Sequence, residues 1–324
     1  MKKSKALGNT VLLVTAMIWG LAFVFQRTGM DYIGPMSFNA ARHILASLAL
    51  LVLIVGLDAI KRKKGELPSQ TMSPEEFAAF KKNTLKGGLY CGAVLVFAAS
   101  MQQLGLVSTS AGKAGFITAM YVVLVPVAGF IFLKKRTGKL QFFAVALATA
   151  GLYLLSVKEG FTIEKGDLYV MACALGYTLY ILIVDKYAPV SDPVRMSFIQ
   201  FAFAFVLTCI IVLFTEGPYS IYWHGPEEYF DSFRYAAVGI LYCGIMSSGV
   251  GYTGQIVGQR YTDSVSASLI MCLESVFAAL FGVLILDEQM SGRELLGCII
   301  MFAAIIISQL PEPRGKASMG MPKA

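Results

Sequence analysis

The chain has 324 residues, of which 56% are hydrophobic and only 15% are charged, and its mean hydropathy is +0.67. Because a soluble domain carries about 25% charged residues, this composition excludes an ordinary soluble enzyme or binding domain. The formal net charge of +7 comes from basic residues that flank apolar segments, so it does not indicate a nucleic-acid partner.

The apolar residues form continuous segments of about 17–25 residues, each long enough to cross a ~30 Å hydrocarbon core as a helix. Strands of a membrane barrel would alternate in polarity and be about half as long, so the segments predict helices. The fold class expected is an all-α polytopic membrane protein. Its ten predicted spans are residues 8–26, 35–57, 86–107, 111–133, 138–157, 166–185, 193–215, 233–257, 264–286 and 291–310.

The first segment follows Lys2, Lys3 and Lys5, as the apolar part of a signal peptide would. No small-residue cleavage site ends it, and Gln26-Arg27 leads directly into the next span. We therefore expect an uncleaved first span.

The longest loop between spans, residues 58–85, contains a helix-start signal at Ser73-Pro74-Glu75-Glu76. The serine oxygen can cap a helix, proline fits its first turn, and acids suit the positive end of its dipole. The sequence leaves two interpretations open, a short helix at the membrane interface or a solvated turn.

The distribution of Lys and Arg predicts the orientation in the membrane. With a cytoplasmic N-terminus, 20 of the 27 basic residues lie on the inside and 6 on the outside, while Arg42 lies within a span. This arrangement follows the positive-inside rule. We expect a multi-pass protein of the cell (inner) membrane with both termini cytoplasmic.

Several sequence segments occur twice. Leu89-Tyr90-Cys91-Gly92 returns as Leu241-Tyr242-Cys243-Gly244, and Met36-Ser37-Phe38 returns as Met196-Ser197-Phe198. Lys134-Lys135 aligns with Asp287-Glu288. The competing interpretation is chance similarity between apolar segments. Two repeats, residues 1–158 and 159–324, would each hold five spans, and because five is odd the second repeat would be inverted in the membrane.

Motifs for other kinds of protein are missing from the sequence. It contains neither a nucleotide-binding P-loop nor an H-E-x-x-H metal motif. The cysteines all fall in apolar segments without a C-x-x-C pair, which favours packing over metal or disulfide roles. We expect no cofactor, no metal site and no enzymatic activity.

Two charged residues lie more than one turn from either end of a predicted span, where each needs a reason. Glu274 is near the middle of the ninth span. It is a candidate proton-coupling carboxylate or contact for a substrate amine, and equally a structural partner within the bundle. Arg42 lies about two turns into the second span. It can bind a substrate carboxylate, or it can snorkel or pair with a neighbouring helix.

Uncharged candidates for a binding site follow the same repeat. Gln102-Gln103 has its counterpart at Gln255, and we take Gln103 and Gln255 as candidate substrate contacts, with polar packing between helices as the alternative. Pro126 is expected to kink the fourth span. The aromatic candidates, for which simple packing is also an alternative, are Trp19, Phe23, Tyr121, Tyr177 and Tyr180.

Motifs spread over nearly the whole chain resemble the EamA-type family of the drug/metabolite transporter superfamily. They are Trp19-Gly20, Ala41-Arg42, Lys113-Ala114-Gly115-Phe116-Ile117, Pro126, and Leu286-Asp287-Glu288 with Gly297. The resemblance implies ten helices in two inverted five-helix repeats, a central cavity, and movement of small organic metabolites or drugs, often outward. One departure is that Lys134-Lys135 stands where family members often carry a glutamate after the fourth span.

The sequence thus favours a transporter of small organic solutes (amino acids, related metabolites or drugs) that exports them by alternating access, with protons as the candidate coupling ion. Its expected partners are the solute and the lipid bilayer, and no oligomeric state is indicated. The alternatives are a non-catalytic subunit of a membrane assembly and a membrane-embedded enzyme, for which the sequence offers no clustered acid and base residues.

Overall fold

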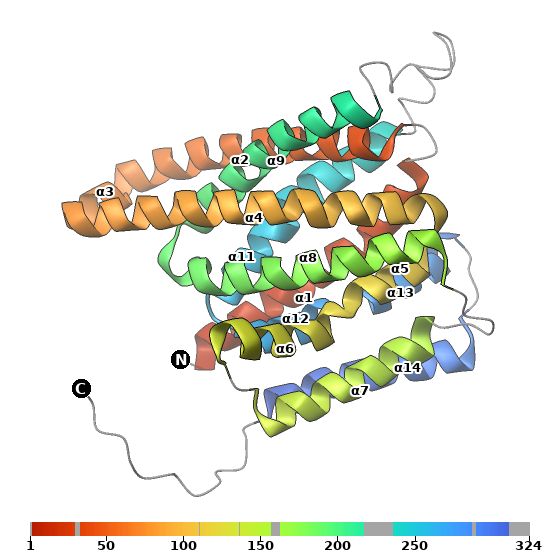
Figure 1. Ribbon diagram of the computed structural model, residues 1–324. Coiled ribbons are helices and arrows are strands. Elements are labelled where there is room, and N and C mark those ends of the chain that lie inside the picture. Colours follow the sequence, from red (N-terminus) through yellow and green to blue (C-terminus); the bar gives the residue numbers. More distant parts are fainter. Residues whose placement is uncertain are drawn as a thin grey trace, which may run out of the picture.

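The computed structural model describes residues 2–29, 33–109, 111–135, 137–156, 163–216, 236–286 and 290–310. Over these ranges the regular structure is entirely helical (Figure 1). Nine described helical segments are long and apolar enough to cross a membrane, and a shorter apolar helix covers Lys139–Leu155. The prediction of an all-α bundle with ten spans is confirmed.

The first five spans come from seven helices, because one span is divided and one short helix lies in a loop. Their bounds are α1 (Lys2–Gly29), α2 (Pro35–Lys64), α3 (Pro68–Thr71), α4 (Pro74–Ser108), α5 (Ala111–Ala119), α6 (Tyr121–Leu133) and α7 (Lys139–Ser156). The last five spans comprise α8 (Lys165–Tyr187), α9 (Pro193–Thr215), η2 (Tyr242–Tyr252) with α11 (Thr253–Gln259), α12 (Ser264–Met271) with α13 (Glu274–Leu286), and α14 (Gly292–Gln309). A short 3₁₀ turn, η1 (Ala188–Val190), joins α8 to α9.

The helix that begins at Ser73 differs from both interpretations of the loop. Ser73 caps it as expected, with its hydroxyl accepting from the Glu76 amide at 3.3 Å and the Glu76 carboxylate accepting from the Ser73 amide at 2.9 Å. However, the helix continues without a break to Ser108. Alanine and lysine between the cap and the third span favour helix, so neither a separate interfacial helix nor a solvated turn forms, and this segment is the first part of α4.

The fourth and ninth spans are each divided near their middle. The fourth breaks at Met120, between α5 and α6, and the ninth breaks at Cys272 and Leu273, between α12 and α13. Pro126 lies inside α6 rather than at the break. The ninth span divides at the equivalent place without a proline, so proline alone does not cause the division. Helices interrupted at mid-membrane form the binding sites of many transporters, because their free ends supply polar groups.

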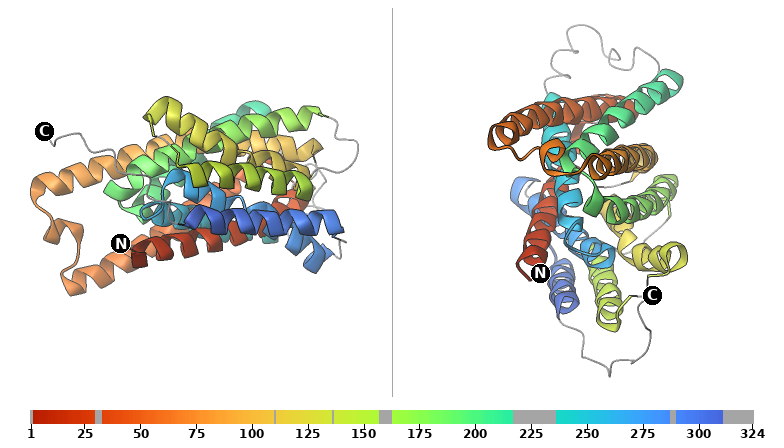
Figure 2. Two further views of the ribbon diagram at one scale, coloured as in Figure 1. Left: turned by 90° about the horizontal axis from the view of Figure 1, so that it is seen from below. Right: turned by 90° about the vertical axis from the view of Figure 1, so that its left-hand side faces the viewer.

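The two sets of five spans have opposite orientations. Figure 1 shows α1 and α8, the first helix of each set, running in opposite directions along the bundle, with α2 beside α9 at one edge and α7 beside α14 at the opposite edge. The end-on view in Figure 2 places the same pairs at the two extremes of the cross-section. Equivalent helices therefore pack against each other at both edges, which is the expected geometry of inverted repeats.

Equivalent polar contacts lie at the two ends of the bundle. At one end the Thr109 hydroxyl donates to Asp167 Oδ1 at 2.9 Å, and at the other the Thr262 hydroxyl donates to Asn9 Oδ1 at 2.9 Å. Neighbouring glycines permit both approaches. A Cβ on Gly166 would lie 2.4 Å from the Thr109 hydroxyl, and one on Gly8 would lie 2.8 Å from the Thr262 hydroxyl. The pairs Gly8/Gly166 and Thr109/Thr262 are separated by 158 and 153 positions, respectively.

The eighth span contains the irregular segment that sets the register between the repeats. Its residues Tyr242–Tyr252 form a π-helix, whereas the third span, α4, is a regular α-helix. At the start of this segment, Gly244 corresponds to Gly92, 152 positions earlier. Beyond it, Gly105 and Gly258 make equivalent close contacts with Gly166 and Gly8, so the separation is 153. The π-helix thus absorbs one extra residue in the second repeat.

Candidate functional site

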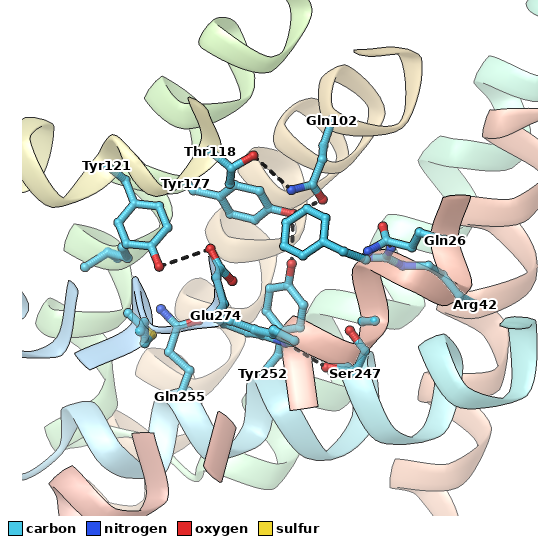
Figure 3. Close-up of a pocket in the computed structure, with 15 residues that line it drawn as sticks. Gln26, Arg42, Gln102, Thr118, Tyr121, Tyr177, Ser247, Tyr252, Gln255 and Glu274 are labelled. Carbon is cyan, nitrogen blue, oxygen red and sulfur yellow. Dashed lines mark hydrogen bonds between the residues drawn. The ribbon is translucent and has the colours of Figure 1, made fainter. Parts of the chain in front are cut away.

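A cavity lies at the centre of the bundle, where the two divided spans meet the first, second, third, sixth and eighth spans (Figure 3). Its volume is about 460 Å³, counted with the open space that adjoins it. The residues that line it are Trp19, Ala22, Phe23, Gln26, Arg42, Gln102, Thr118, Tyr121, Tyr177, Ile181, Ser247, Tyr252, Gln255, Met271 and Glu274.

Most of the cavity wall consists of equivalent positions from the two repeats. Five pairs, separated by 158 or 153 positions, contribute both members: Trp19 with Tyr177, Phe23 with Ile181, Gln102 with Gln255, Thr118 with Met271, and Tyr121 with Glu274. The fold symmetry therefore builds the central part of the site.

The remaining wall residues break this symmetry. Ala22, Gln26 and Arg42 line the cavity, but their equivalents Tyr180, Val184 and Gln200, each 158 positions later, do not. Those three side chains are fully buried. The Tyr180 hydroxyl donates to Gln200 Oε1 at 2.8 Å, and the Tyr180 ring packs edge-on against Tyr252 with the centroids 5.5 Å apart. The cavity thus reaches α1 and α2, whereas the equivalent residues of α8 and α9 lie outside its wall; we call the filled position between α8 and α9 the closed route.

Glu274 is the acidic group of the cavity wall. Its side chain is 4% exposed, and its Oε1 accepts a hydrogen bond from the Tyr121 hydroxyl at 3.2 Å. As the first residue of α13, it also lies at the positive end of a helix dipole. No ion pair reaches Glu274 from the parts of the chain that the structure describes. The carboxylate is therefore held in place but has capacity for a proton or a cation.

A chain of hydrogen bonds crosses the middle of the cavity. The Tyr252 hydroxyl donates to the Tyr177 hydroxyl at 3.0 Å, which donates to Gln102 Oε1 at 3.3 Å. The Gln102 amide nitrogen in turn donates to the Thr118 hydroxyl at 3.2 Å. These bonds join four spans and fix the orientation of the two phenol rings and the amide.

Arg42 lies on the side of the cavity away from Glu274, as Figure 3 shows. Its Nη1 donates to Gln26 Oε1 at 2.8 Å. Lys113, at the beginning of α5, lies outside the cavity wall and pairs with the buried Asp167 of α8 at 2.5 Å. Arg42 and Glu274 therefore place one basic and one acidic group, the two poles of the cavity, on opposite sides of its wall.

The structure brings together seven of the nine residues that the sequence proposed for binding: Trp19, Phe23, Arg42, Tyr121, Tyr177, Gln255 and Glu274. Tyr180 and Gln103 lie outside the wall. Gln102, rather than its neighbour Gln103, lines the cavity and is the position equivalent to Gln255 in the other repeat. The repeat separation of 153 that aligns Lys134-Lys135 with Asp287-Glu288 contains that signal, since it pairs Gln102 with Gln255. Gln26, Thr118, Ser247 and Tyr252 also line the cavity without having been predicted.

Comparison with protein families assigns the chain. The model of the EamA-like transporter family matches residues 6–157 and again residues 164–309. The chain belongs to the EamA-like transporter family. The resemblance stated from sequence motifs is thereby confirmed, and the cavity belongs to a membrane transporter with a small-molecule solute and a lipid surround.

Curated relatives of this EamA-like transporter match along most of their length. An uncharacterized transporter of Archaeoglobus fulgidus is 29% identical, over 92% of this chain and 84% of its own. The uncharacterized transporter YcxC of Bacillus subtilis is 23% identical, over 96% of this chain and 95% of its own. A WAT1-related chloroplastic protein of Arabidopsis thaliana is 24% identical, over 94% of this chain and 69% of its own. One solved crystal structure has the same fold, with a TM-score of 0.68 at 14% identity over 95% of this chain and 97% of the other.

Proposed function

We propose that this EamA-like transporter exports small organic solutes, amino acids, related metabolites or drugs, across the cell membrane by alternating access. The observation that carries the proposal is the central cavity, which lies at two broken spans and takes its wall in equivalent pairs from both repeats. A subunit with a purely structural role would favour a packed centre, so the cavity weighs against that alternative. Export, rather than uptake, rests on the family resemblance.

The orientation proposed places both termini in the cytoplasm. The helix α2 ends in Lys61, Arg62, Lys63 and Lys64, and Lys134 and Lys135 follow α6. Both helix ends lie on the inside in this orientation, as the positive-inside rule requires. The cavity then extends toward the outer side, between α1 and α2, and the closed route between α8 and α9 faces inward.

The mechanism proposed is an exchange of roles between the two repeats, residues 1–158 and 159–324. Inverted repeats let each half adopt the conformation that the other has here. When the second repeat takes the arrangement of the first, Tyr180, Val184 and Gln200 line an inner route. In the same step, Ala22, Gln26 and Arg42 become covered. The hydrogen bond between Tyr180 and Gln200 is the contact that must break.

Proton coupling is proposed to use Glu274. This carboxylate lies at the broken span with a tyrosine hydroxyl as its partner, and it can hold either a proton or the amine of a solute but not both. Competition between the two would link outward solute movement to inward proton movement. Charge balance is preserved, because each cation that leaves Glu274 is replaced by one proton.

The test is flux in proteoliposomes, with candidate solutes inside and a pH gradient imposed. We expect wild-type protein to move at least one solute faster with the gradient than without it. Glu274→Gln should lose the stimulation by the gradient and retain solute exchange, whereas Glu75→Gln, an exposed acid at the start of α4, should behave as wild type. If Glu274→Gln responds to the gradient as wild type does, the coupling role is wrong. If no solute from any class moves, transport by this cavity is wrong.

A further inference from the structure

We propose that Arg42 and Gln26 form a carboxylate-binding subsite and that the solute is a zwitterion whose amine contacts Glu274. The inference rests on the proposed transport through this cavity and specifies what the cavity binds.

The first argument is the state of the Arg42 side chain. Arg42 is 2% exposed and is among the largest fully buried side chains of the molecule. Gln26, an uncharged amide, accepts from its Nη1, and its Nε atom has no hydrogen-bond partner within the described residues. No described carboxylate pairs with it. A buried cation with so few partners is costly, so a structural ion pair does not explain its presence.

The second argument is the position of Arg42 in the fold. Its equivalent in the other repeat is Gln200, which is buried and bonded to Tyr180. Equivalence is clear from the packing, because the Arg42 carbonyl lies near Gly244 just as the Gln200 carbonyl lies near Gly92. A glutamine is therefore enough to fill the space at this position of the repeat. The guanidinium adds a charge only where the wall faces the cavity, and a planar fork of donors matches a carboxylate.

The third argument is the opposite wall. Glu274 lies across the cavity from Arg42, with Tyr177 and Tyr252 between them (Figure 3). A ligand that carries both an anion and a cation neutralises both poles at once. A simple carboxylate or a simple amine leaves one pole unpaired, and an unpaired buried charge lowers affinity. The aromatic and apolar part of the wall, which includes Trp19, Phe23 and Ile181, suits an apolar side chain.

The test measures binding, separately from transport. Purified protein in detergent is titrated with leucine, phenylalanine and methionine, and with three relatives of each: the amide, which has only the amine, the des-amino acid, which has only the carboxylate, and the des-amino amide, which has neither. Binding is read as the rise in the thermal unfolding midpoint. We expect at least one amino acid to bind about tenfold or more tightly than its three relatives, because each lost charged contact is worth about that much.

Substitutions at Arg42 and Glu274 test which residue binds the carboxylate of the solute and which binds its amine. Arg42→Gln places on α2 the residue that α9 carries at the equivalent position, so it is expected to fold. The Arg42→Gln variant should bind the amino acid no more tightly than it binds the corresponding amide. Glu274→Gln should bind the amino acid no better than its des-amino acid. Arg42→Lys, which keeps the charge without the fork, should retain part of the preference for a carboxylate.

Any of three results would overturn the inference, and two of them concern the preference for a carboxylate. One is equal binding of the amino acids and their amides by wild type, and the other is an unchanged preference for the carboxylate in Arg42→Gln. Failure of every amino acid to bind also contradicts it. In those cases flux of a different solute class in proteoliposomes would leave the proposed transport function standing, and absence of all flux would reject both.

Discussion

The Tyr121 hydroxyl donates a hydrogen bond to Glu274 at 3.2 Å, and the two residues, 153 positions apart, occupy the same place in the two repeats. Each is the first residue of the second half of a broken span. Because equivalent residues contact each other, the pseudo-twofold axis of the fold passes close to this bond. One copy of the position has a phenol and the other an acid, so only the second repeat supplies the proposed proton site.

The strength of the hydrogen bond between Tyr121 and Glu274 can be measured with a double-mutant cycle. We expect Tyr121→Phe to lower the free energy of unfolding by about 1–3 kcal/mol, since it leaves a buried carboxylate oxygen without its donor. The same substitution in a Glu274→Gln background should cost less, because an amide oxygen is a weaker acceptor than a carboxylate. Reversible unfolding of purified protein gives both values. Equal costs in the two backgrounds would mean that the hydroxyl does not interact with the acid.

Exchanging the two side chains tests the equivalence of the positions. Glu274→Tyr alone should abolish flux driven by a pH gradient, because the cavity then lacks an acid. The double variant Tyr121→Glu with Glu274→Tyr restores one acid and one phenol across the axis, and we expect it to recover part of that flux. The measurement is gradient-driven transport in proteoliposomes. Lack of recovery in a double variant that folds and binds solute would show that the acid must be on α13.

The adjacent glutamines of α4 should respond differently to substitution. Gln102 lines the cavity and bonds to Tyr177 and Thr118, so Gln102→Leu should weaken solute binding. Gln103 is fully buried, and neither polar atom of its amide has a partner in the described ranges. Gln103→Leu should therefore raise the free energy of unfolding by about 1–3 kcal/mol and leave binding unchanged. Thermal unfolding with and without solute separates the two effects.

Hydropathy alone was enough to predict the bundle, because the membrane imposes one requirement on every span: about twenty apolar residues with all backbone groups paired. The inverted arrangement followed from the odd number of spans in each repeat. Those predictions need no knowledge of side-chain packing, which is why they agree with the structure.

The exact lining of the cavity could not be predicted in the same way. Choosing between Gln102 and Gln103 requires the repeat register to one residue, and the π-helix at Tyr242–Tyr252 changes that register from 152 to 153 within the span. The pairing of Met36 with Met196 suggested a separation of 160 for the second span, whereas the glycine contacts of Arg42 and Gln200 give 158. Nor does any residue type distinguish Tyr177, in the wall, from Tyr180, which closes the opposite route.

The ion pair between Lys113 and Asp167 has an uncharged equivalent at the other end of the bundle, where Asn9 replaces the acid. Asp167→Asn should keep the bond from Thr109, since Asn9 accepts the same bond from Thr262, but it should lose the attraction to Lys113. We expect a lower thermal unfolding midpoint, because the Asp167 side chain is 1% exposed and a buried partner is removed. Asp263→Asn, an exposed acid near the opposite end, is the control and should change the midpoint less.

Reciprocal exposure of positions on the two equivalent routes would be the clearest sign of alternating access. Ala22 lines the cavity on the first route, and Val184, the equivalent of Gln26, lies on the second. Both are buried, and cysteine fits either place with little change in volume. In the arrangement described here, Ala22→Cys lies in the wall of the open cavity and Val184→Cys lies in the closed route. We expect a membrane-impermeant thiol reagent to label Ala22→Cys from outside at once, and Val184→Cys from inside only after the repeats exchange roles.

Solute and a pH gradient should shift the two labelling rates in opposite directions, because opening one route requires closing the other. The measurement uses oriented vesicles, a reagent added to one side, and protein without either substitution as the control for its native cysteines. Of these, Cys91, Cys173, Cys243, Cys272 and Cys298 are buried. If both positions gain or lose reactivity together under every condition, then the two routes open simultaneously and the protein is a channel-like facilitator rather than an alternating-access transporter.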